Sequence, residues 1–451
     1  MNGGWSLLGD LPRFRRDPLA FFTDLARDGD VVPVRLVTRG FLINRPDYIK
    51  HVLQDNHTNY GKGPLYPRLK PVAGEGLVTS EGELWRRQRR LAQPVFSRDR
   101  IASFATTMTT RTDAMLERWA SHAERGEPLD VHAEMMTLTL AILGDTVFGI
   151  DLSHESDVLT RAVTAAIEIT NRRVYSLFPA PLRWPTRRNR RYRRVLATLD
   201  AVVNDMIARK RGARTAPNDL LSMLMAARDD ETGEQMSDRQ LRDEAMTMLI
   251  AGHETTALVL SFTWYLLSLH PDVERKLHEE VSRVLGDRCP SSEDLPHLGY
   301  TSLVVHEVMR LYPPAWFIAR RAINEDTIGR QRIPAGSAVL LVPYLTHRHP
   351  AYWDNPEGFD PERFTPERSA GRPRFAYFPF AAGPRQCIGS NFAMMEAQLI
   401  VAMIVQRYRL RLVPGHRLEL DASITLRPRH GITMTLQRTD VSSSVDRREV
   451  T

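Results

Sequence analysis

The sequence is poor in cysteine and in long apolar runs. Its 451 residues include two cysteines, Cys289 and Cys387, which excludes a disulfide-framed fold and indicates a reducing compartment. The first residues, MNGGWSLLGDLPRF, have no charged region followed by an apolar core, so we expect neither a signal peptide nor a membrane anchor. The most apolar stretch, 249–269, is interrupted by His253 and Glu254 and falls short of the roughly 20 apolar residues of a membrane span. We therefore expect a cytoplasmic protein.

The chain also lacks internal repeats, flexible linkers and a G-x-G-x-x-G dinucleotide fingerprint. Hydrophobic residues make up 42% and charged residues 25% of the chain, as in ordinary soluble globular proteins. No composition shift marks a boundary, so we expect one large domain over residues 1–438. The polar segment 439–451 predicts a disordered C-terminal tail.

The net charge of +7 is concentrated in two basic runs, WRRQRR (85–90) and RWPTRRNRRYRR (183–194). Such runs suit nucleic acid, anionic lipid, an acidic protein or simply a solvated helix face. Aromatic residues do not alternate with the arginines in a stacking pattern. A basic nucleic-acid-binding protein is one alternative class, and it predicts steeply salt-dependent binding.

Helical patterns dominate from about residue 84 to 312, and short strand patterns flank them. The longest predicted helix covers 237–271, with Ser237 as its N-cap and Pro271 just past its end. Its apolar residues cover most faces, which predicts burial on most sides. A last helix begins near Ser390, and four apolar residues form one face of it: Phe392, Met395, Leu399 and Met403. The fold class is mainly α with a small β part.

The segment FAAGPRQCIG carries the most specific chemistry. Cys387 directly precedes the last helix, where the helix dipole stabilises a thiolate. Gly383 and Gly389 allow turns that a Cβ forbids, and they let a flat ligand approach the backbone. Arg385 supplies a positive charge, and Phe380 can shield the sulfur from water. A catalytic nucleophile needs a histidine partner, which this loop lacks. We assign no role to the other cysteine.

These ten residues match the F-x-x-G-x-R-x-C-x-G signature at every fixed position, so the chain resembles the cytochrome P-450 family of haem-thiolate monooxygenases. The resemblance runs nearly end to end. It implies a helix-rich triangular prism with haem b between the long central helix and the helix after the cysteine loop. Cys387 is then the axial thiolate ligand of the iron. A haem sensor without turnover is a second alternative.

The sequence AGHETT, in the middle of the long helix, resembles the oxygen-activation motif of the family. The resemblance gives Gly252 the role of leaving room for dioxygen. It gives Glu254 and Thr255 the role of relaying protons. A hydroxyl bonded to its own helix and a salt-bridged carboxylate are the structural alternative. HETTA lacks the second histidine of a zinc-protease motif.

The family's E-x-x-R motif matches EVMR, and its meander motif matches FDPERF. Glu307, Arg310 and Arg363 are then expected to form a structural triad. ELWR (83–86) and EVSR (280–283) fit the same short pattern. The order of motifs along the chain selects EVMR.

Several basic residues are implied partners of the two haem carboxylates. Trp85 and Arg89 match the family's W-x-x-x-R, and Arg385 lies in the cysteine loop. Arg321 occupies the position of a further partner, although Arg320 beside it leaves the register open.

The implied reaction inserts one oxygen atom of O₂ into a hydrophobic small molecule. Electrons come from a separate partner, either a ferredoxin with its reductase or a flavodoxin. A peroxide-driven enzyme is the near alternative. Five largely apolar stretches are expected to contact substrate: 60–78, 175–186, the first half of the long helix, PPAWFIA and the turn at Ile424. Similarity to terpene-oxidising actinobacterial members suggests a terpene, with fatty acids and polyketides as alternatives. We expect a monomer that has no nucleic-acid partner.

Overall fold

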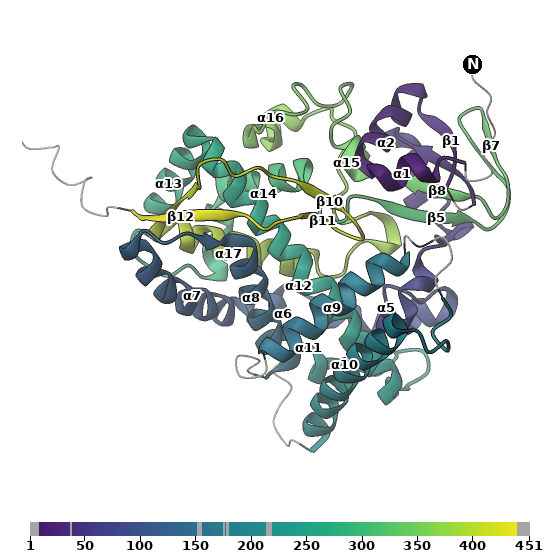
Figure 1. Ribbon diagram of the computed structural model, residues 1–451, viewed down its shortest axis with the longest axis horizontal. Helices are drawn as coiled ribbons and strands as arrows, with labels where there is room; N and C mark the ends of the chain where they lie inside the picture. Colours follow the sequence, from purple (N-terminus) through teal and green to yellow (C-terminus); the bar gives the residue numbers. More distant parts are fainter. Residues whose placement is uncertain are drawn as a thin grey trace, which may run out of the picture.

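The structure is a computed structural model that describes residues 9–36, 38–150, 156–174, 176, 180–212 and 219–439. The predicted tail beyond residue 439 lies outside the described residues, as do positions 175 and 177–179 of one predicted substrate stretch. Helices form most of the molecule, and the strands of the largest sheet gather at one side beside the N-terminal helices (Figure 1).

The helices of the first half of the chain are α1 (Leu11–Arg16), α2 (Pro18–Leu25), α3 (Pro46–Lys50), α4 (Lys70–Ala73), α5 (Gly82–Ala92), α6 (Arg98–Ala102), α7 (Ala105–Arg125), α8 (Val131–Leu143), α9 (Ser156–Val174), α10 (Arg187–Gly212) and α11 (Leu220–Ala226). Those of the second half are α12 (Asp238–Leu269), α13 (Pro271–Leu285), α14 (Gly299–Leu311), α15 (Pro343–Thr346), α16 (Pro366–Ser369) and α17 (Ser390–Arg407).

The strands are β1 (Val31–Arg35), β2 (Arg39–Ile43), β3 (Tyr60–Lys62), β4 (Leu129–Asp130), β5 (Ile318–Ala322), β6 (Asp326–Ile328), β7 (Gln331–Ile333), β8 (Ala338–Leu341), β9 (Tyr408–Leu412), β10 (Leu420–Ala422), β11 (Leu426–Pro428) and β12 (Thr433–Arg438). The largest sheet has the order β1-β2-β8-β5-β3, in which only β2 and β8 are parallel. The remaining strands form a three-stranded sheet, β4-β12-β9, and the hairpins β6-β7 and β10-β11.

The predicted long helix is confirmed as α12, and the cause of its start is visible. Ser237 accepts from the backbone N–H of Gln240, whose side chain accepts from the Ser237 N–H, so the two form a capping box. His270 follows the last turn, and Pro271 opens α13. The helix packs against α8, α14 and α17, and its residues are buried on most faces.

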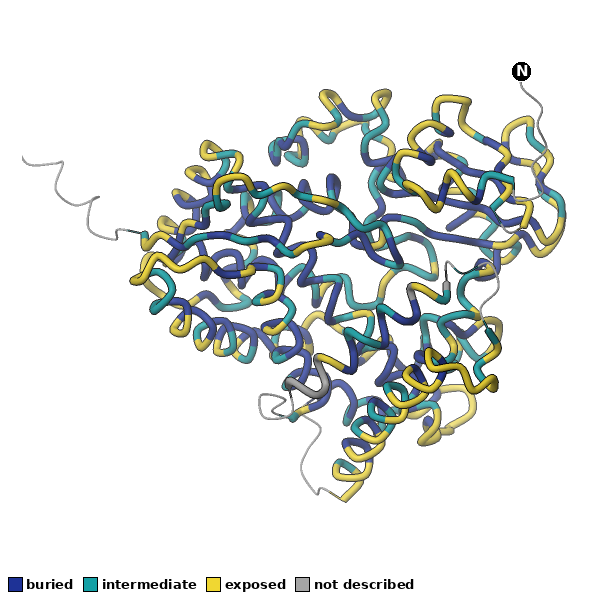
Figure 2. The backbone as a smooth tube through the Cα atoms, in the orientation of Figure 1, coloured by how far each residue is buried: buried dark blue, intermediate teal, exposed yellow. Residues whose placement is uncertain are grey.

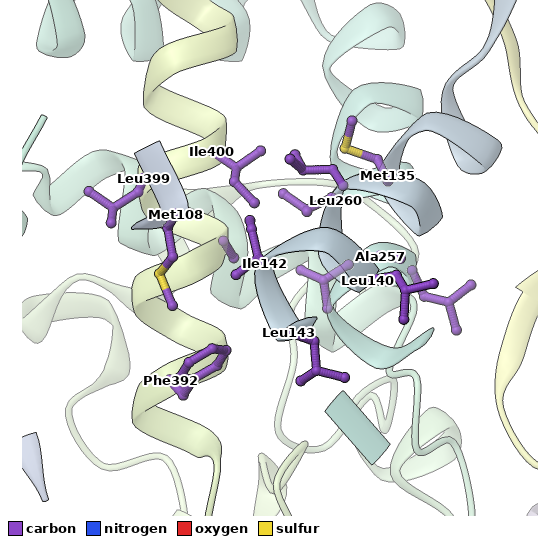
Figure 3. Packing of buried hydrophobic residues seen from close by; sticks show 14 of the residues in the cluster. Met108, Met135, Leu140, Ile142, Leu143, Ala257, Leu260, Phe392, Leu399 and Ile400 are labelled. Atoms are coloured by element: carbon purple, nitrogen blue, oxygen red, sulfur yellow. The ribbon is translucent and has the colours of Figure 1, made fainter. Parts of the chain in front are cut away.

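The core is built where α8, α12 and α17 meet. Figure 3 shows side chains from the three helices lying close together, among them Ile142, Leu260 and Ile400. The predicted apolar face of α17 is confirmed, because its four residues Phe392, Met395, Leu399 and Met403 are all buried. Exposed residues lie at the periphery, notably along α10 (Figure 2).

Two helical segments, Val131–Phe148 and Asp238–Leu269, have the length and hydropathy of a membrane span. Within the protein, 61% and 72% of the respective apolar windows are buried. Their apolar character is therefore accounted for by packing against other helices.

Candidate functional site

The cysteine loop is closed by its own backbone. The Cys387 N–H donates to the Phe380 carbonyl oxygen at 2.9 Å. Gly383 has φ +68°, and a Cβ there would lie 1.9 Å from the carbonyl oxygen of Leu53, so this position requires glycine. Gly389 differs: its φ is −87° and a Cβ would meet nothing within 4 Å. The predicted turn requirement is thus wrong for Gly389, and the open space beside it agrees with the predicted approach of a flat ligand.

The thiol of Cys387 is accessible although protein atoms surround it closely. Burial by those atoms raises the pKa of the thiol. The Gly389 N–H and the charge of Arg89 oppose that rise. The neighbouring positive charge is therefore Arg89, and not Arg385 as the sequence suggested. Since burial outweighs both effects, a bound metal ion is what would keep this sulfur deprotonated.

The register of β5 decides between the two adjacent arginines. Arg320 is buried and faces inward, whereas Arg321 is exposed, so the predicted role of Arg321 is corrected to Arg320. Successive side chains of a strand point to opposite faces of the sheet. Arg320 is the antiparallel partner of Lys62 on β3. Two like charges directly opposite each other destabilise a sheet unless an anion lies between them.

Arg385 joins this pair to form a cluster of three buried or half-buried cations, which we call the cation cluster (Lys62, Arg320, Arg385). Burial and the two neighbouring arginines lower the pKa of Lys62 to about 6. Burial and Arg320 lower the pKa of Arg385, and the buried Nη1 of Arg385 has no hydrogen-bond partner. The unsatisfied donor and the mutual repulsion both indicate a missing anion.

Trp85 and Arg89 lie one helical turn apart on α5, and both contact the cysteine loop. The guanidinium of Arg385 lies 4.4 Å from the Trp85 ring centre, a cation–π contact that joins Trp85 to the cation cluster. Arg89 donates to the Gln386 carbonyl oxygen at 2.9 Å and to the Gln93 side chain at 2.8 Å. Arg89 thus contacts the cysteine loop at the residue before Cys387.

The middle of α12 carries the sequence AGHETT. Ala251 is exposed although it lies in a largely buried helix, and the Thr255 hydroxyl donates to its carbonyl oxygen at 2.7 Å. A Cβ on Gly252 would lie 2.9 Å from the Leu143 side chain. The Leu143 side chain of α8 therefore packs against Gly252, and the role of Gly252 in making room for dioxygen stays a prediction.

Glu254 is buried, and burial raises the pKa of its carboxyl group while the positive charge of Arg427 opposes the rise. The Arg427 Nη1 lies 3.9 Å from its Oε1. A buried acid and a hydroxyl thus occupy successive positions of the helix. Lys62 and Arg427 were missed as site residues by sequence reasoning, because only the folded chain brings their side chains to the site.

The structure brings the predicted triad together in the core. Arg310 Nε and Nη2 donate to the two carboxylate oxygens of Glu307 at 2.7 and 2.8 Å. Arg363 Nε donates to Glu307 Oε1 at 3.3 Å. Both arginines also donate to backbone carbonyls of the segment 354–358. The triad therefore fixes the irregular chain that leads into the cysteine loop. The incidental match ELWR instead gives an exposed pair between Arg86 and Glu83.

The residues fit a haem group. An iron porphyrin with two carboxylates needs a ligand for its iron, room beside the backbone and cations for its carboxylates. The chain offers an accessible thiol, an open space beside Gly389 and the cation cluster, in which Arg385 Nη1 has no hydrogen-bond partner. Within the described ranges, no group of three or more His, Cys, Asp or Glu side chains could hold a metal ion. A single sulfur ligand therefore requires that the remaining ligands come from a cofactor.

Comparison with known proteins agrees with this geometry. The family model described as Cytochrome P450 matches residues 2–434. Cyclooctatin synthase of Streptomyces melanosporofaciens is 37% identical over 436 residues, which cover 96% of this chain and 92% of the relative. Cyclooctat-9-en-7-ol 5-monooxygenase of the same organism is 37% identical, with 92% and 89% covered. Pentalenene oxygenase of Streptomyces avermitilis is 33% identical, with 91% of each covered.

The crystal structure of the cytochrome P450DA heme domain superimposes with a TM-score of 0.88 at 28% identity, over 95% of both chains. The predicted fold class is therefore confirmed. Haem b with a cysteine thiolate is the cofactor of the family. The chain belongs to the cytochrome P450 family and is a haem-thiolate monooxygenase.

Proposed function

We propose that the protein oxygenates a hydrophobic terpene-class molecule in the cytoplasm, with electrons from a separate ferredoxin and its reductase or from a flavodoxin. The observation that carries the reaction class is the accessible Cys387 thiol in a loop open at Gly389, with the cation cluster close by. Bound haem supplies the reductive activation of dioxygen. The chain supplies the ligand, the orientation and the proton route.

Each residue of the site has a distinct task in this proposal. Cys387 binds the iron through Sγ. Arg385, Arg320 and Lys62 bind the two haem carboxylates, and the predicted roles of Trp85 and Arg89 become supporting ones: Trp85 orients Arg385 through its ring, and Arg89 holds the loop carbonyl of Gln386. Bidentate guanidinium–carboxylate contacts fix orientation as well as charge.

Protons travel through Glu254 and Thr255. Burial raises the pKa of Glu254, so this carboxyl can carry a proton closer to neutral pH than an exposed glutamate can. The Thr255 hydroxyl, which donates a hydrogen bond to the Ala251 carbonyl oxygen, is the group that passes the proton toward the haem. The Thr255→Ala variant is expected to bind haem normally but to consume reductant without forming a matching amount of product.

The substrate class rests on two kinds of support. Two relatives are named for oxidations of cyclooctat-9-en-7-ol and of pentalenene. The predicted contact stretches are largely apolar, and apolar pockets bind apolar ligands. A screen of terpenes, fatty acids and polyketides for a change in the haem spectrum tests the class. Tight binding of only fatty acids or only polyketides would refute it.

The absorbance spectrum of the reduced protein with carbon monoxide tests the reaction class. A strongly red-shifted Soret band is expected for thiolate-ligated haem. Cys387→Ala should abolish the band. Cys289→Ala is the matched control, because this cysteine lies outside the cysteine loop, and it should leave the band unchanged. Protein without haem, or with haem that lacks the shifted band, contradicts the proposal. A normal band with no product from any oxidisable substrate favours the haem-sensor alternative.

A further inference from the structure

The C-terminal hairpin β10–β11 reaches the acid on α12 through one arginine. Arg427, on β11, places Nη1 3.9 Å from Glu254 Oε1 and donates from Nε to Asp421 Oδ2 at 2.9 Å. Glu254 is 6% exposed at its side chain, Arg427 23% and Asp421 32%. The arginine therefore links a buried acid on the central helix with a half-exposed acid on the hairpin.

Arg427 lies closer to Asp421 than to Glu254, so it binds the two acids in different ways. Asp421 is within hydrogen-bond distance, and its Oδ2 also accepts from the Ser423 hydroxyl at 2.9 Å. Glu254 lies beyond hydrogen-bond distance of Arg427, so only charge links these two groups, while the Thr425 hydroxyl in the hairpin turn also stabilises the ionised carboxylate. Glu254 can therefore gain or lose a proton without breaking a hydrogen bond to the arginine.

The two histidines near Arg427 and Glu254 are uncharged at pH 7. His132, on α8, faces Arg427, and burial lowers the pKa of its imidazole. His253 precedes Glu254 on α12, and burial lowers its pKa to about 4. Both imidazoles are therefore neutral at pH 7. Asp130, which faces His132, is the remaining acid that faces this group. Arg427 is thus the cation that acts on Glu254, and Asp421 is the nearby competing anion.

The hairpin is fixed to a predicted substrate-contact stretch. The Trp316 indole N–H donates to the Ser423 carbonyl oxygen at 2.8 Å, and the Leu426 N–H donates to the Pro314 carbonyl oxygen at 3.0 Å. The turn between the two strands includes Ile424, another expected substrate contact. The same short hairpin therefore carries both a substrate-contacting turn and the arginine that acts on Glu254.

We propose that Arg427 is a positioning residue that holds the ionised Glu254 carboxylate against the hairpin, and that Asp421 limits how strongly it does so. The inference rests on the proposed function only in giving Glu254 the proton-carrying role. Removal of Arg427 takes away the charge that favours the ionised form, so Glu254 holds its proton more tightly. Removal of the Asp421 charge leaves Arg427 free to favour the ionised form more strongly, so the effect has the opposite sign.

Infrared titration of the Glu254 carboxyl group tests this in the full haem-loaded protein without turnover. The Glu254 band is identified by its loss in Glu254→Gln. Arg427→Met should move the titration midpoint to higher pH by one unit or more, a tenfold change in proton affinity. Asp421→Asn should move it to lower pH, and Arg427→Lys should restore most of the Arg427→Met shift. Arg429→Met is the matched control, because exposed Arg429 on the same hairpin pairs with Glu419 at 3.3 Å, and it should shift nothing.

Opposite shifts in the two variants support the proposal. No shift, or shifts of the same sign, overturn it, because loss of hairpin packing alone would not depend on the sign of the removed charge. If Arg427→Met does not fold, Arg427→Gln, which also removes the charge, takes its place and is judged with Asp421→Asn by the same criterion. The monooxygenase assignment is judged separately by the carbon monoxide spectrum, so either conclusion can fail alone.

As a second readout, the pH at which product formed per electron is half-maximal should follow the infrared midpoint in each variant. A structural role of the hairpin would lower the yield at every pH without moving that midpoint.

Discussion

At the scale of single residues, two buried carboxyl groups differ in the side chains that surround them. Glu254 faces a cation, whereas Glu396, on α17, is buried with the Thr256 hydroxyl as its neighbour. Burial raises the pKa of Glu396 to about 8, and the Thr256 hydroxyl opposes the rise. Glu396 is therefore a neutral acid at pH 7 that joins the two helices on either side of the predicted haem position.

Glu396→Gln is expected to change how stability depends on pH. Unfolding lowers the pKa of this carboxyl from about 8 to the ordinary glutamate value, so the folded state binds more protons than the unfolded state between those values. The contribution of Glu396 to the free energy of unfolding thus falls as pH rises from about 4.5 to about 8 and is constant above that.

Urea unfolding at several pH values measures the effect. The free energy of unfolding of Glu396→Gln, relative to that of the wild type, should rise by on the order of a few kcal/mol between pH 5 and pH 8. Glu279→Gln, an exposed residue paired with Arg275, should show no such trend. Parallel wild-type and Glu396→Gln curves would mean that this carboxyl is ionised in the folded protein.

Lys62 gives a second prediction at the residue scale. If it binds a haem carboxylate, Lys62→Met removes a charge-assisted hydrogen bond worth about 1.5–3 kcal/mol. Transfer of haem to an excess of a haem-free acceptor protein should then be about tenfold faster or more. Lys70→Met removes an exposed lysine that pairs with Glu75 at 2.6 Å and should leave the rate unchanged. Equal rates for both variants would remove Lys62 from the carboxylate site.

At the scale of elements, the packing of α8 against α12 decides what Gly252 does. The Leu143 side chain on α8 occupies the position next to the missing Cβ. His253 Nε2 and the Met136 carbonyl oxygen, 2.9 Å apart, add a polar contact between the same helices. Thr139 donates to the His253 carbonyl oxygen at 3.0 Å. The glycine therefore allows close packing of the two helices.

A double-mutant cycle between Gly252 and Leu143 tests this packing. Gly252→Ala favours the helix by up to about 1 kcal/mol but brings a methyl group against Leu143. In the Leu143→Ala background that clash is absent. The coupling between the two substitutions, measured by urea unfolding, should therefore be about 1–2 kcal/mol. Additive effects would show that the methyl group points away from Leu143.

At the scale of the whole molecule, one large cluster of buried hydrophobic residues extends from Val72 to Leu436. Buried hydrophobic residues from Leu11 to Tyr60 belong to two smaller clusters, so a single domain over residues 1–438 stays a prediction. Glu307, Arg310 and Arg363 connect the large cluster to the irregular segment before the cysteine loop. The three side chains are 0–4% exposed, so loss of one charge leaves the others buried without compensation.

Glu307→Gln should accordingly cost about 3–5 kcal/mol of folding free energy, as expected when one partner of a buried ion pair is removed. The cysteine loop depends on the same segment, so the haem content of purified protein should fall as well. Glu83→Gln breaks the exposed pair with Arg86 and should cost less than about 1 kcal/mol. Unfolding in urea and the haem-to-protein absorbance ratio measure both effects. A stable Glu307→Gln protein with full haem content would contradict the structural role.

The sequence by itself determined those features that depend on nearby residues or on spaced motifs. The capped long helix, the apolar face of α17, the Cys387 loop and the family were all predictable, because capping, periodicity and a ten-residue signature are local. Tertiary structure decided which of Arg320 and Arg321 faces inward, that Lys62 lies opposite it, what packs against Gly252 and that Arg427 reaches Glu254. Each of these depends on strand register or on contact between segments far apart in the chain, which no local pattern records.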